Sequence, residues 1–276
     1  MATRLRDTLM SRLGDLRFEP TEKRVRAVLG DSEIARTDAA MLVWQPRRVV
    51  PLYAVPERDL AGELVPGAAV AGQAQPPDGG MLHGRAVLAV GDFAAHTTPG
   101  DPLVLRTAGG EVAAFRPADP DLAGYVVLDF EGPDAWFEED EQVVSHPRDP
   151  FHRVDVRRGS RHVQVELEGR PLAESREPRL VFETNLPTRW YLPRTDVREE
   201  LLRPSDHRTA CAYKGRATYH DVALGDRVEP HLVWTYEDPL PDAAELAGLL
   251  AFFDERVDVV VDGVRRERPV TPWSRP

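Results

Sequence analysis

The sequence contains one cysteine, Cys211, and its only lysines are Lys23 and Lys214 among 35 basic residues. A single thiol excludes a disulfide within the chain and a structural zinc site built from several thiolates. Long apolar runs are missing too, because stretches such as residues 249–253 are far shorter than the ~20 residues that cross a bilayer. We therefore expect a soluble, cytoplasmic protein that uses no membrane, no metal and no other cofactor.

A basic surface is also lacking, since the formal net charge is −11 at pH 7. Most of the acid excess falls in the first half of the chain. A nucleic-acid partner normally leaves a clustered basic footprint on the protein, so we expect none here. Arginine replaces lysine almost throughout, as GC-rich codon usage would cause, and this makes each remaining lysine more informative.

The 276 residues, of which 42% are hydrophobic, can fill the cores of two ordinary domains. The 25 prolines keep strands short and loops frequent, which favours small sheets over a parallel α/β layer. We predict a mostly β protein with two related compact domains and few short helices.

Internal similarity indicates a duplication. The segments that begin at Val25 and Val163 align at one offset, and the matched pairs are Ile34 with Leu172, Ala35 with Ala173, Thr37 with Ser175, Leu42 with Leu180 and Trp44 with Phe182. Downstream we match residues 53–56 with 190–193, 84–86 with 215–217, 129–133 with 235–239, and 153–156 with 256–259. These matches predict an N-terminal helical extension at 1–18, a first β domain at 19–158 and a second at 159–276.

Local patterns place hairpins in both copies. In the second copy, Val163, Val165 and Leu167 alternate with polar residues and precede the turn pair Glu168-Gly169, which is typical of a β-hairpin. The run of alternating valines before Asp262-Gly263 follows the same pattern.

Helical patterns are few. Leucines four residues apart predict an amphipathic helix over residues 3–14. Asp242 and Glu245 form a capping pattern ahead of Leu246, Leu249 and Leu250. This pattern predicts the start of a second helix.

Cys211 and Lys214 are the strongest candidates for a reactive group. A nearby cation lowers the pKa of a thiol, and a desolvated lysine can act as a base or Schiff-base nucleophile, which arginine cannot. The alternatives are that Cys211 is a small buried hydrophobe and that Lys214 is a turn residue. Glu183 follows the predicted strand 179–182 and is the candidate carboxylate, either paired with Lys214 or acting as general acid or base. A solvated strand end is the alternative for Glu183.

Aromatic residues gather in the same part of the chain, namely Trp190, Tyr191, Tyr213, Tyr219, Trp234 and Tyr236. Such residues can line a ligand-binding cage that stacks on a planar molecule or holds a cation. Strand alternation places Trp234 and Tyr236 on one face and separates Trp190 from Tyr191. Some of them must therefore belong to the core, and the alternative is that most simply fill the interior.

Three further segments have less specific patterns. His146, Asp149 and His152 are metal-capable, but the prolines between them hold the run extended, and we interpret it as a linker between the domains. Residues 138–141 are interpreted as a solvated acidic face. In the first copy, the Gly/Pro-rich residues 66–80 replace the cysteine segment, and His83 takes the place of Lys214.

The run Thr209-Ala-Cys-Ala-Tyr-Lys-Gly-Arg-Ala-Thr-Tyr219, together with residues 146–150, 180–184, 186–193 and 233–236, resembles the bacterial family catalogued as domain of unknown function 427, in its two-domain form. The family motif usually reads Cys-Pro-Tyr-Lys-Gly, and Ala212 stands here in place of the proline. The resemblance implies a compact, strongly bent β fold, similar to the β-tent of methionine sulfoxide reductase B-type and cereblon-type domains, without their zinc cysteines. It implies no settled activity.

The family has also been labelled nucleotidyltransferase-like, but the chain has no Gly-Ser motif followed by a strand with paired carboxylates. Our leading hypothesis is a small-molecule pocket in the second domain, with Cys211 or Lys214 as the reactive group if the protein is an enzyme. The alternative is a non-catalytic interaction module in which the acidic first domain and residues 66–80 recruit a partner. A third hypothesis is that the duplication serves stability alone.

Overall fold

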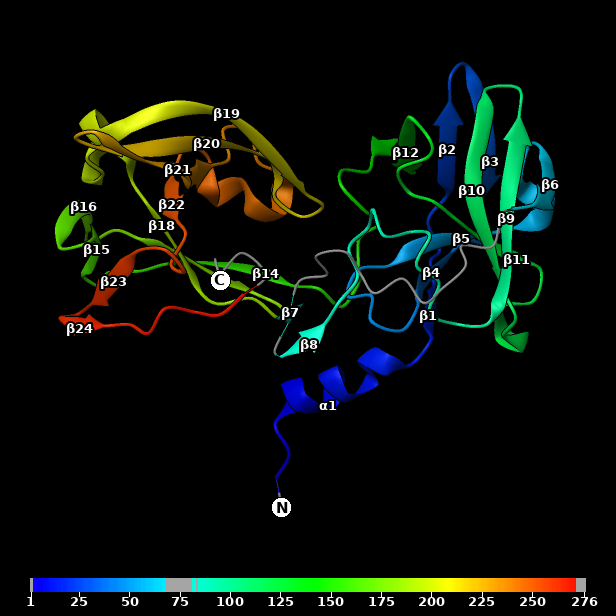
Figure 1. The fold of residues 1–276 in the computed structure, drawn as a ribbon, viewed down its shortest axis with the longest axis horizontal. Helices are drawn as coiled ribbons and strands as arrows, with labels where there is room; N and C mark the ends of the chain where they lie inside the picture. The colour runs from blue at the N-terminus through cyan, green and yellow to red at the C-terminus, as the bar shows by residue number, and fades with distance from the viewer. Residues whose placement is uncertain (1, 68–80, 83, 272–276) are drawn as a thin grey trace. The chain divides into compact units, whose positions relative to one another are not determined.

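The structure is a computed structural model that describes residues 2–67, 81–82 and 84–271. The chain divides into two compact units, Met1–Pro150 and Phe151–Pro276, and both are built mainly from β-strands (Figure 1). None of the helices in these residues is long and apolar enough to span a membrane. Most of the predicted 66–80 loop, and His83, lie outside the described residues.

The first unit contains two antiparallel sheets preceded by the predicted helix, observed as α1 (Leu5–Ser11) and the 3-10 turn η1 (Arg12–Gly14). Its larger sheet has the spatial order β1 (Arg17–Pro20), β4 (Met41–Trp44), β5 (Leu52–Pro56), β11 (Tyr125–Leu128), β10 (Gly110–Pro117), β9 (Gly100–Thr107) and β6 (Glu63–Pro66). Its smaller sheet has the order β13 (Glu141–Gln142), β12 (Ala135–Glu138), β2 (Val25–Leu29) and β3 (Ser32–Thr37). Two short 3-10 helices are η2 (Glu57–Asp59) and η3 (Pro120–Leu122).

The second unit also has a large and a small antiparallel sheet. The large sheet has the order β14 (Val154–Arg158), β17 (Arg179–Glu183), β18 (Arg189–Leu192), β22 (Leu250–Phe252), β21 (Arg227–Thr235), β20 (Gly215–Leu224) and β19 (Leu202–Cys211). The small sheet has the order β16 (Arg170–Ser175), β15 (Val163–Leu167), β23 (Asp258–Val261) and β24 (Val264–Arg265). The 3-10 helices are η4 (Arg194–Asp196), η5 (Glu199–Leu201) and η6 (Pro241–Leu246).

The two units have the same strand order. Taken one by one in chain order, β1 to β6 occupy the same places in their sheets as β14 to β19, and β9 to β13 the same places as β20 to β24. Even an irregularity is shared, because a register shift after Ala27 in β2 has its counterpart after Val165 in β15. Between β6 and β9 the first unit has an additional hairpin, β7 (Met81–Leu82) and β8 (Arg85–Ala86).

Three of the predicted sequence matches pair segments that are not equivalent in the fold. Residues 84–86 belong to the β7–β8 hairpin, whereas Gly215 opens β20, the counterpart of β9. Residues 129–133 follow β11, whereas 235–239 follow β21, the counterpart of β10. Both Arg-Val-Asp-Val segments lie in the second unit, around β14 and β23. These short strings were matched by composition, but strand pairing sets the true equivalence.

The division between the units follows Pro150 rather than Arg158. The strand β14 pairs along its whole length with β17, for example Val156 with Val181, and therefore belongs to the second unit. The helix predicted from Asp242 is limited to η6, because Gly248 adopts a left-handed conformation with φ of +70° and the chain then enters β22 at Leu250. The hairpin turn at Glu168-Gly169 is confirmed, with both residues at positive φ.

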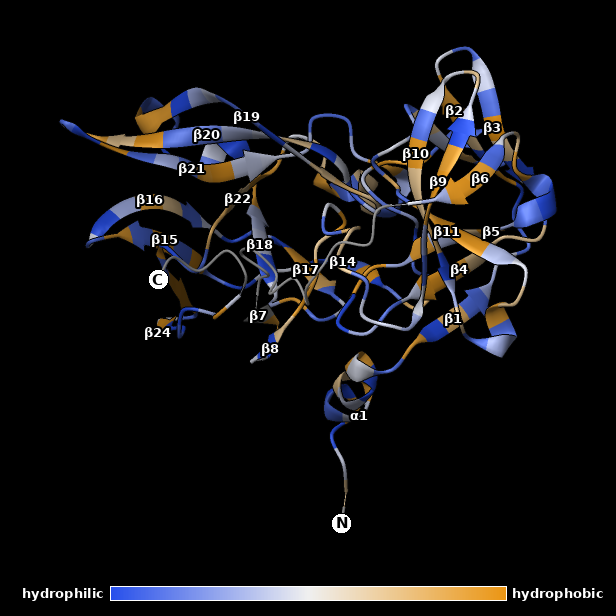
Figure 2. Ribbon diagram, turned by 45° about the vertical axis from the view of Figure 1, so that its right-hand side comes forward, coloured by the Kyte–Doolittle hydropathy of each residue, from blue (hydrophilic) through white to orange (hydrophobic). Residues whose placement is uncertain are grey.

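Each large sheet packs an apolar cluster against both of its faces, whereas the edge strand β19 is mostly polar and exposed (Figure 2). In the second unit, a core formed by residues such as Val165, Leu192 and Phe252 fills the space between the two sheets. A separate cluster, which we call the aromatic cluster, lies on the other face of the large sheet and is covered by η6. It consists of Val181, Tyr191, Ala217, Tyr219, Trp234, Tyr236, Ala243, Leu246 and Ala251.

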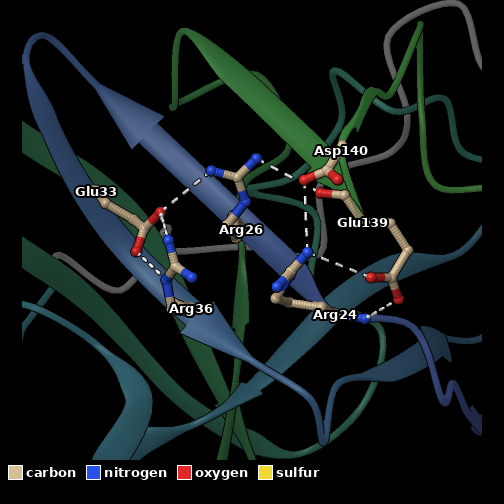
Figure 3. A network of polar contacts seen from close by, with 6 residues as sticks. All are labelled: Arg24, Arg26, Glu33, Arg36, Glu139 and Asp140. Atoms are coloured by element: carbon tan, nitrogen blue, oxygen red, sulfur yellow. Dashed lines mark hydrogen bonds and ion pairs between the residues drawn. The ribbon is translucent and has the colours of Figure 1, made fainter.

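Surface ion pairs join β2, β3 and the β12–β13 turn of the first unit (Figure 3). The residues of this network are Arg24, Arg26, Glu33, Arg36, Glu139 and Asp140. Asp140 is almost fully exposed, and exposed ion pairs contribute at most about 1 kcal/mol each. The network therefore adds little to the packing of the two sheets.

The core between the sheets should dominate the stability of the second unit. We expect Leu192→Ala to lower the free energy of unfolding by about 2–5 kcal/mol, because Leu192 is fully buried and its removal leaves a cavity. The matched control is Val264→Ala on β24, whose side chain is exposed and whose loss should change stability by less than about 0.5 kcal/mol. Urea unfolding followed by circular dichroism measures both, and equal effects would contradict this account of the core.

Candidate functional site

Lys214 lies in the tight turn that joins β19 to β20. Its carbonyl oxygen accepts a hydrogen bond from the amide of Leu240 at 3.1 Å, which ties the turn to the segment after β21. Gly215 has a φ of +97°, in the left-handed region that favours glycine, and a Cβ there would lie 3.3 Å from Leu240 N. The backbone of the turn therefore requires the glycine, and the side chain of the preceding lysine is buried, with only 9% exposed.

Glu183 is the last residue of β17, as the sequence predicted, but it is buried rather than solvated. One carboxylate oxygen, Oε2, forms an ion pair with Nζ of Lys214. The other, Oε1, lies 3.1 Å from Nε2 of His152. The carboxylate thus has two basic partners on different segments, and its side chain is only 6% exposed.

The electrostatic environment keeps this pair ionised. Burial alone would raise the pKa of Glu183, but the hydrogen bond from His152 and the charge of Lys214 bring that pKa below its ordinary value. Burial likewise opposes the charge on Lys214, and the carboxylate of Glu183 together with Cys211 and Tyr191 raises the pKa of Lys214 above its ordinary value. A protonated amine is neither a base nor a nucleophile, so the arrangement favours Cys211 over Lys214 as the reactive group.

Cys211 ends β19 and is partly exposed, directly before the turn that holds Lys214. Its Cα is paired with that of Gly215 across the turn. A negative charge on Cys211 would raise the pKa of both Lys214 and Tyr236, which places the thiol within electrostatic reach of both groups. Cys211 is thus the partly exposed residue beside Lys214 and Tyr236, which are buried.

Tyrosine hydroxyls complete this polar group. Tyr191 is fully buried, and burial raises its pKa to about 12. Its oxygen accepts a hydrogen bond from Nε1 of Trp234 at 2.9 Å. Tyr236 also has a raised pKa because of burial and the nearby Tyr191 and Cys211. The hydroxyl of Tyr219 lies 2.9 Å from Oγ1 of Thr209.

The aromatic residues divide as strand alternation predicted. Trp190 packs in the core between the two sheets, whereas Tyr191 lies on the opposite face with Trp234 and Tyr236. Tyr213 belongs to neither cluster, and its ring stacks on that of His152 with centroids 4.1 Å apart. Trp190 therefore lies apart from the other candidate ligand-binding residues.

His152 is a site residue that the sequence reasoning missed. Its run with His146 and Asp149 was interpreted as a linker, but the boundary between the units falls inside the run, after Pro150. His152 then contacts Glu183 and Tyr213 within the second unit. No spacing rule could have found it, because the contact joins residues 31 positions apart.

The first unit has different residues at the equivalent positions. The register of β4 on β5 matches that of β17 on β18, which places Ala54 at the position of Tyr191 and Gln45 at that of Glu183. The Gln45 side chain lies beside a fully buried arginine, Arg48, whose guanidinium donates to the carbonyl oxygens of Ala89 and Asp92. The carboxylate and the tyrosine of the site are therefore specific to the second unit.

Removing one partner of the buried ion pair should be costly. We expect Lys214→Met to lower the free energy of unfolding by about 3–5 kcal/mol, because Glu183 would keep a buried charge without its counterion. The double variant Lys214→Met/Glu183→Gln should recover much of this loss. Lys23→Met is the matched control, because the Lys23 side chain is 46% exposed, against 9% for Lys214, and its loss should cost at most about 1 kcal/mol. Denaturant unfolding measures the free energy of unfolding of each variant. If the double variant lost the sum of the two single losses, Lys214 and Glu183 would not be coupled.

Acid should remove the contribution of Glu183. Because its pKa in the fold lies below the ordinary 4.5, the carboxylate stabilises the protein above pH 4.5 and loses this effect as the pH falls through the lowered value. Glu183→Gln should therefore be less stable than the wild type at pH 7, and the difference should shrink below pH 4.5. Urea midpoints measured between pH 7 and pH 3 provide the comparison, and a constant difference would count against it.

Among the described residues, no group of three or more histidine, cysteine, aspartate or glutamate side chains is arranged to hold a metal ion. No curated protein matches the chain at a significant level. Residues 155–263 match the family described as Domain of unknown function (DUF427). The matched segment lies within the second unit and includes Glu183, Cys211 and Lys214, so the second unit is similar to this family.

Proposed function

We propose that the second unit binds a small molecule through a carbonyl or carboxylate oxygen at the group formed by Lys214, Tyr191 and Cys211, and that Cys211 is the residue that can react with it. The observation that carries this proposal is a buried ammonium, held by Glu183, in the same tight turn as the partly exposed Cys211, whose charge acts on the pKa of Lys214. The whole chain is proposed to be a tandem of two related domains, which the shared strand order of the units supports.

Unused hydrogen-bond donors support an acceptor ligand. Lys214 has three N–H groups, and among the described residues its ammonium has one acceptor, Glu183. Tyr191 accepts from Trp234, and no described residue accepts the proton of its own hydroxyl. Buried donors normally find a partner, so these donors favour a ligand that offers an oxygen lone pair.

Stability alone does not explain the ion pair. Replacing a buried ion pair by apolar residues of similar volume is often neutral or stabilising, because the charges lose their hydration. A strongly perturbed ionisable pair beside an accessible nucleophile is typical of functional sites. The first unit, which keeps the strand order but has Gln45 and Ala54 at these positions, supports a role beyond folding for Glu183 and Tyr191.

The ammonium of Lys214 can stabilise the product of a reaction at Cys211. The thiolate is the nucleophilic form of a cysteine. If the thiolate adds to a carbonyl carbon, an S–C bond forms and the C–O π electrons become a lone pair on oxygen. Lys214 can stabilise that oxyanion by a charge-assisted hydrogen bond, and water supplies the proton that completes the hemithioacetal.

The chain offers a clean test because Cys211 is its only thiol. Iodoacetate carries a carboxylate, whereas iodoacetamide is neutral. We expect the ratio of the iodoacetate rate to the iodoacetamide rate to be higher in the wild-type protein than in Lys214→Met. The ratio of the two rates should fall on the order of 10-fold in the variant, which corresponds to about 1.4 kcal/mol and is within the attraction of a close ion pair. Mass spectrometry of the intact protein measures both rates.

Lys23→Met is the control, since it removes the same charge from an ion pair of the first unit and should leave the ratio unchanged. Lys214→Arg should keep most of the effect because it keeps the charge. Circular dichroism checks that each variant is folded. An equal ratio in the wild type and in folded Lys214→Met would refute the proposal and favour a non-catalytic interaction module.

A further inference from the structure

Two irregularities in the large sheet of the second unit lie on either side of the same part of β20. The pairing of β19 with β20 shifts register between Ser205 and Arg208, and the pairing of β20 with β21 shifts between His220 and Val222. Bulges of this kind re-aim side chains and are frequent beside functional sites. The first shift includes His207, and the second lies opposite His231, which has a φ of +53°.

The two shifts bring the imidazoles of His207 and His231 together. The rings stack with centroids 4.6 Å apart and an interplanar angle of 29°. The ring of His207 also packs edge-on against Tyr219 at 4.6 Å. His207 is exposed, and the side chain of His231 is 45% exposed, so solvent reaches both rings.

One nitrogen of His231 is held by oxygen atoms. Its Nδ1 lies 2.7 Å from Oγ of Ser205 and 3.4 Å from Oδ1 of Asp221. The same carboxylate oxygen accepts the backbone amide of His231 at 2.7 Å, and the serine oxygen accepts the amide of His207 at 3.1 Å. When Nδ1 donates to these oxygens, Nε2 carries the free lone pair. A carboxylate behind a histidine is the usual support of a metal-binding imidazole.

The geometry excludes a hydrolytic triad at this place. In a Ser-His-Asp triad the serine and the aspartate contact different ring nitrogens, whereas Ser205 and Asp221 both lie at Nδ1 of His231. Nε2 of His231 and both ring nitrogens of His207 have no hydrogen-bond partner among the described residues. Three imidazole nitrogens are therefore open on one exposed surface.

We propose that His207 and His231 form a binding site for a divalent transition-metal ion that prefers imidazole, such as Cu²⁺, Zn²⁺ or Ni²⁺. The protein supplies two ligands, and water or a small ligand occupies the remaining positions. Hard cations such as Mg²⁺ select oxygen ligands and should not compete. The inference is independent of the role proposed for Cys211.

Copper binding tests this site directly. Isothermal titration of the full chain with CuSO₄ should give one strong site, and the electron paramagnetic resonance spectrum should show nitrogen coordination. His207→Asn and His231→Gln should each weaken the affinity at least 10-fold. Asp221→Asn should weaken it on the order of 10-fold while both imidazoles remain, since it removes the support of His231.

Two controls separate this site from others. His162→Asn removes another imidazole of the second unit, which contacts Glu174 at 2.7 Å, and should leave the affinity unchanged. Cys211→Ser excludes binding at the thiol and should also bind as the wild type does. The proposal is overturned if the wild type binds no copper, if Cys211→Ser abolishes binding, or if the His207→Asn and His162→Asn variants bind alike.

Discussion

The ion pair between Glu183 and Lys214 requires the large sheet of the second unit to be strongly curved. Glu183 ends β17, and Lys214 follows β19 at the far edge, with β18, β22 and β21 between β17 and β20. On a flat sheet four inter-strand spacings amount to roughly 19 Å, farther than these two side chains can reach between them. The β19–β20 hairpin must therefore curl over the sheet face, and both strands are visibly curved in Figure 1. This curvature encloses the aromatic cluster and leaves Cys211 at the rim.

The elements that the sequence predicted well are those set by neighbours along the chain. The Glu168-Gly169 turn and the opposite faces of Trp190 and Tyr191 follow from period-two alternation and from positive φ at the turn, which act over a few residues. The strand equivalence of the units was only partly predictable. Segments such as Gly84-Arg85-Ala86 resemble their supposed partners in composition, but strand pairing over long separations decides which strands correspond.

The sequence predicted the site residues as residue types with one connection, the pairing of Glu183 with Lys214, and it predicted none of the others. Cys211 and Lys214 were selected because a lone thiol and a rare lysine are visible in composition, and Glu183 because it follows a predicted strand. The contact of His152 with Glu183 joins distant segments and leaves no periodic signal. The His207–His231 pair depends on two register shifts in neighbouring strand pairs, and a bulge is a property of pairing rather than of one strand.

The two units share the features that the fold requires and differ in the residues of the site. Both units keep the same strand order, the same register shift and an apolar cluster on each face of the large sheet. A neutral glutamine, Gln45, and an alanine, Ala54, satisfy this architecture in the first unit. The fold therefore does not require a buried carboxylate at the end of β17, and the charge that the first unit buries beside Gln45 is a different one, Arg48. A carboxylate that the architecture does not need, and that costs hydration to bury, is the feature on which the proposed role of Lys214 and Cys211 rests.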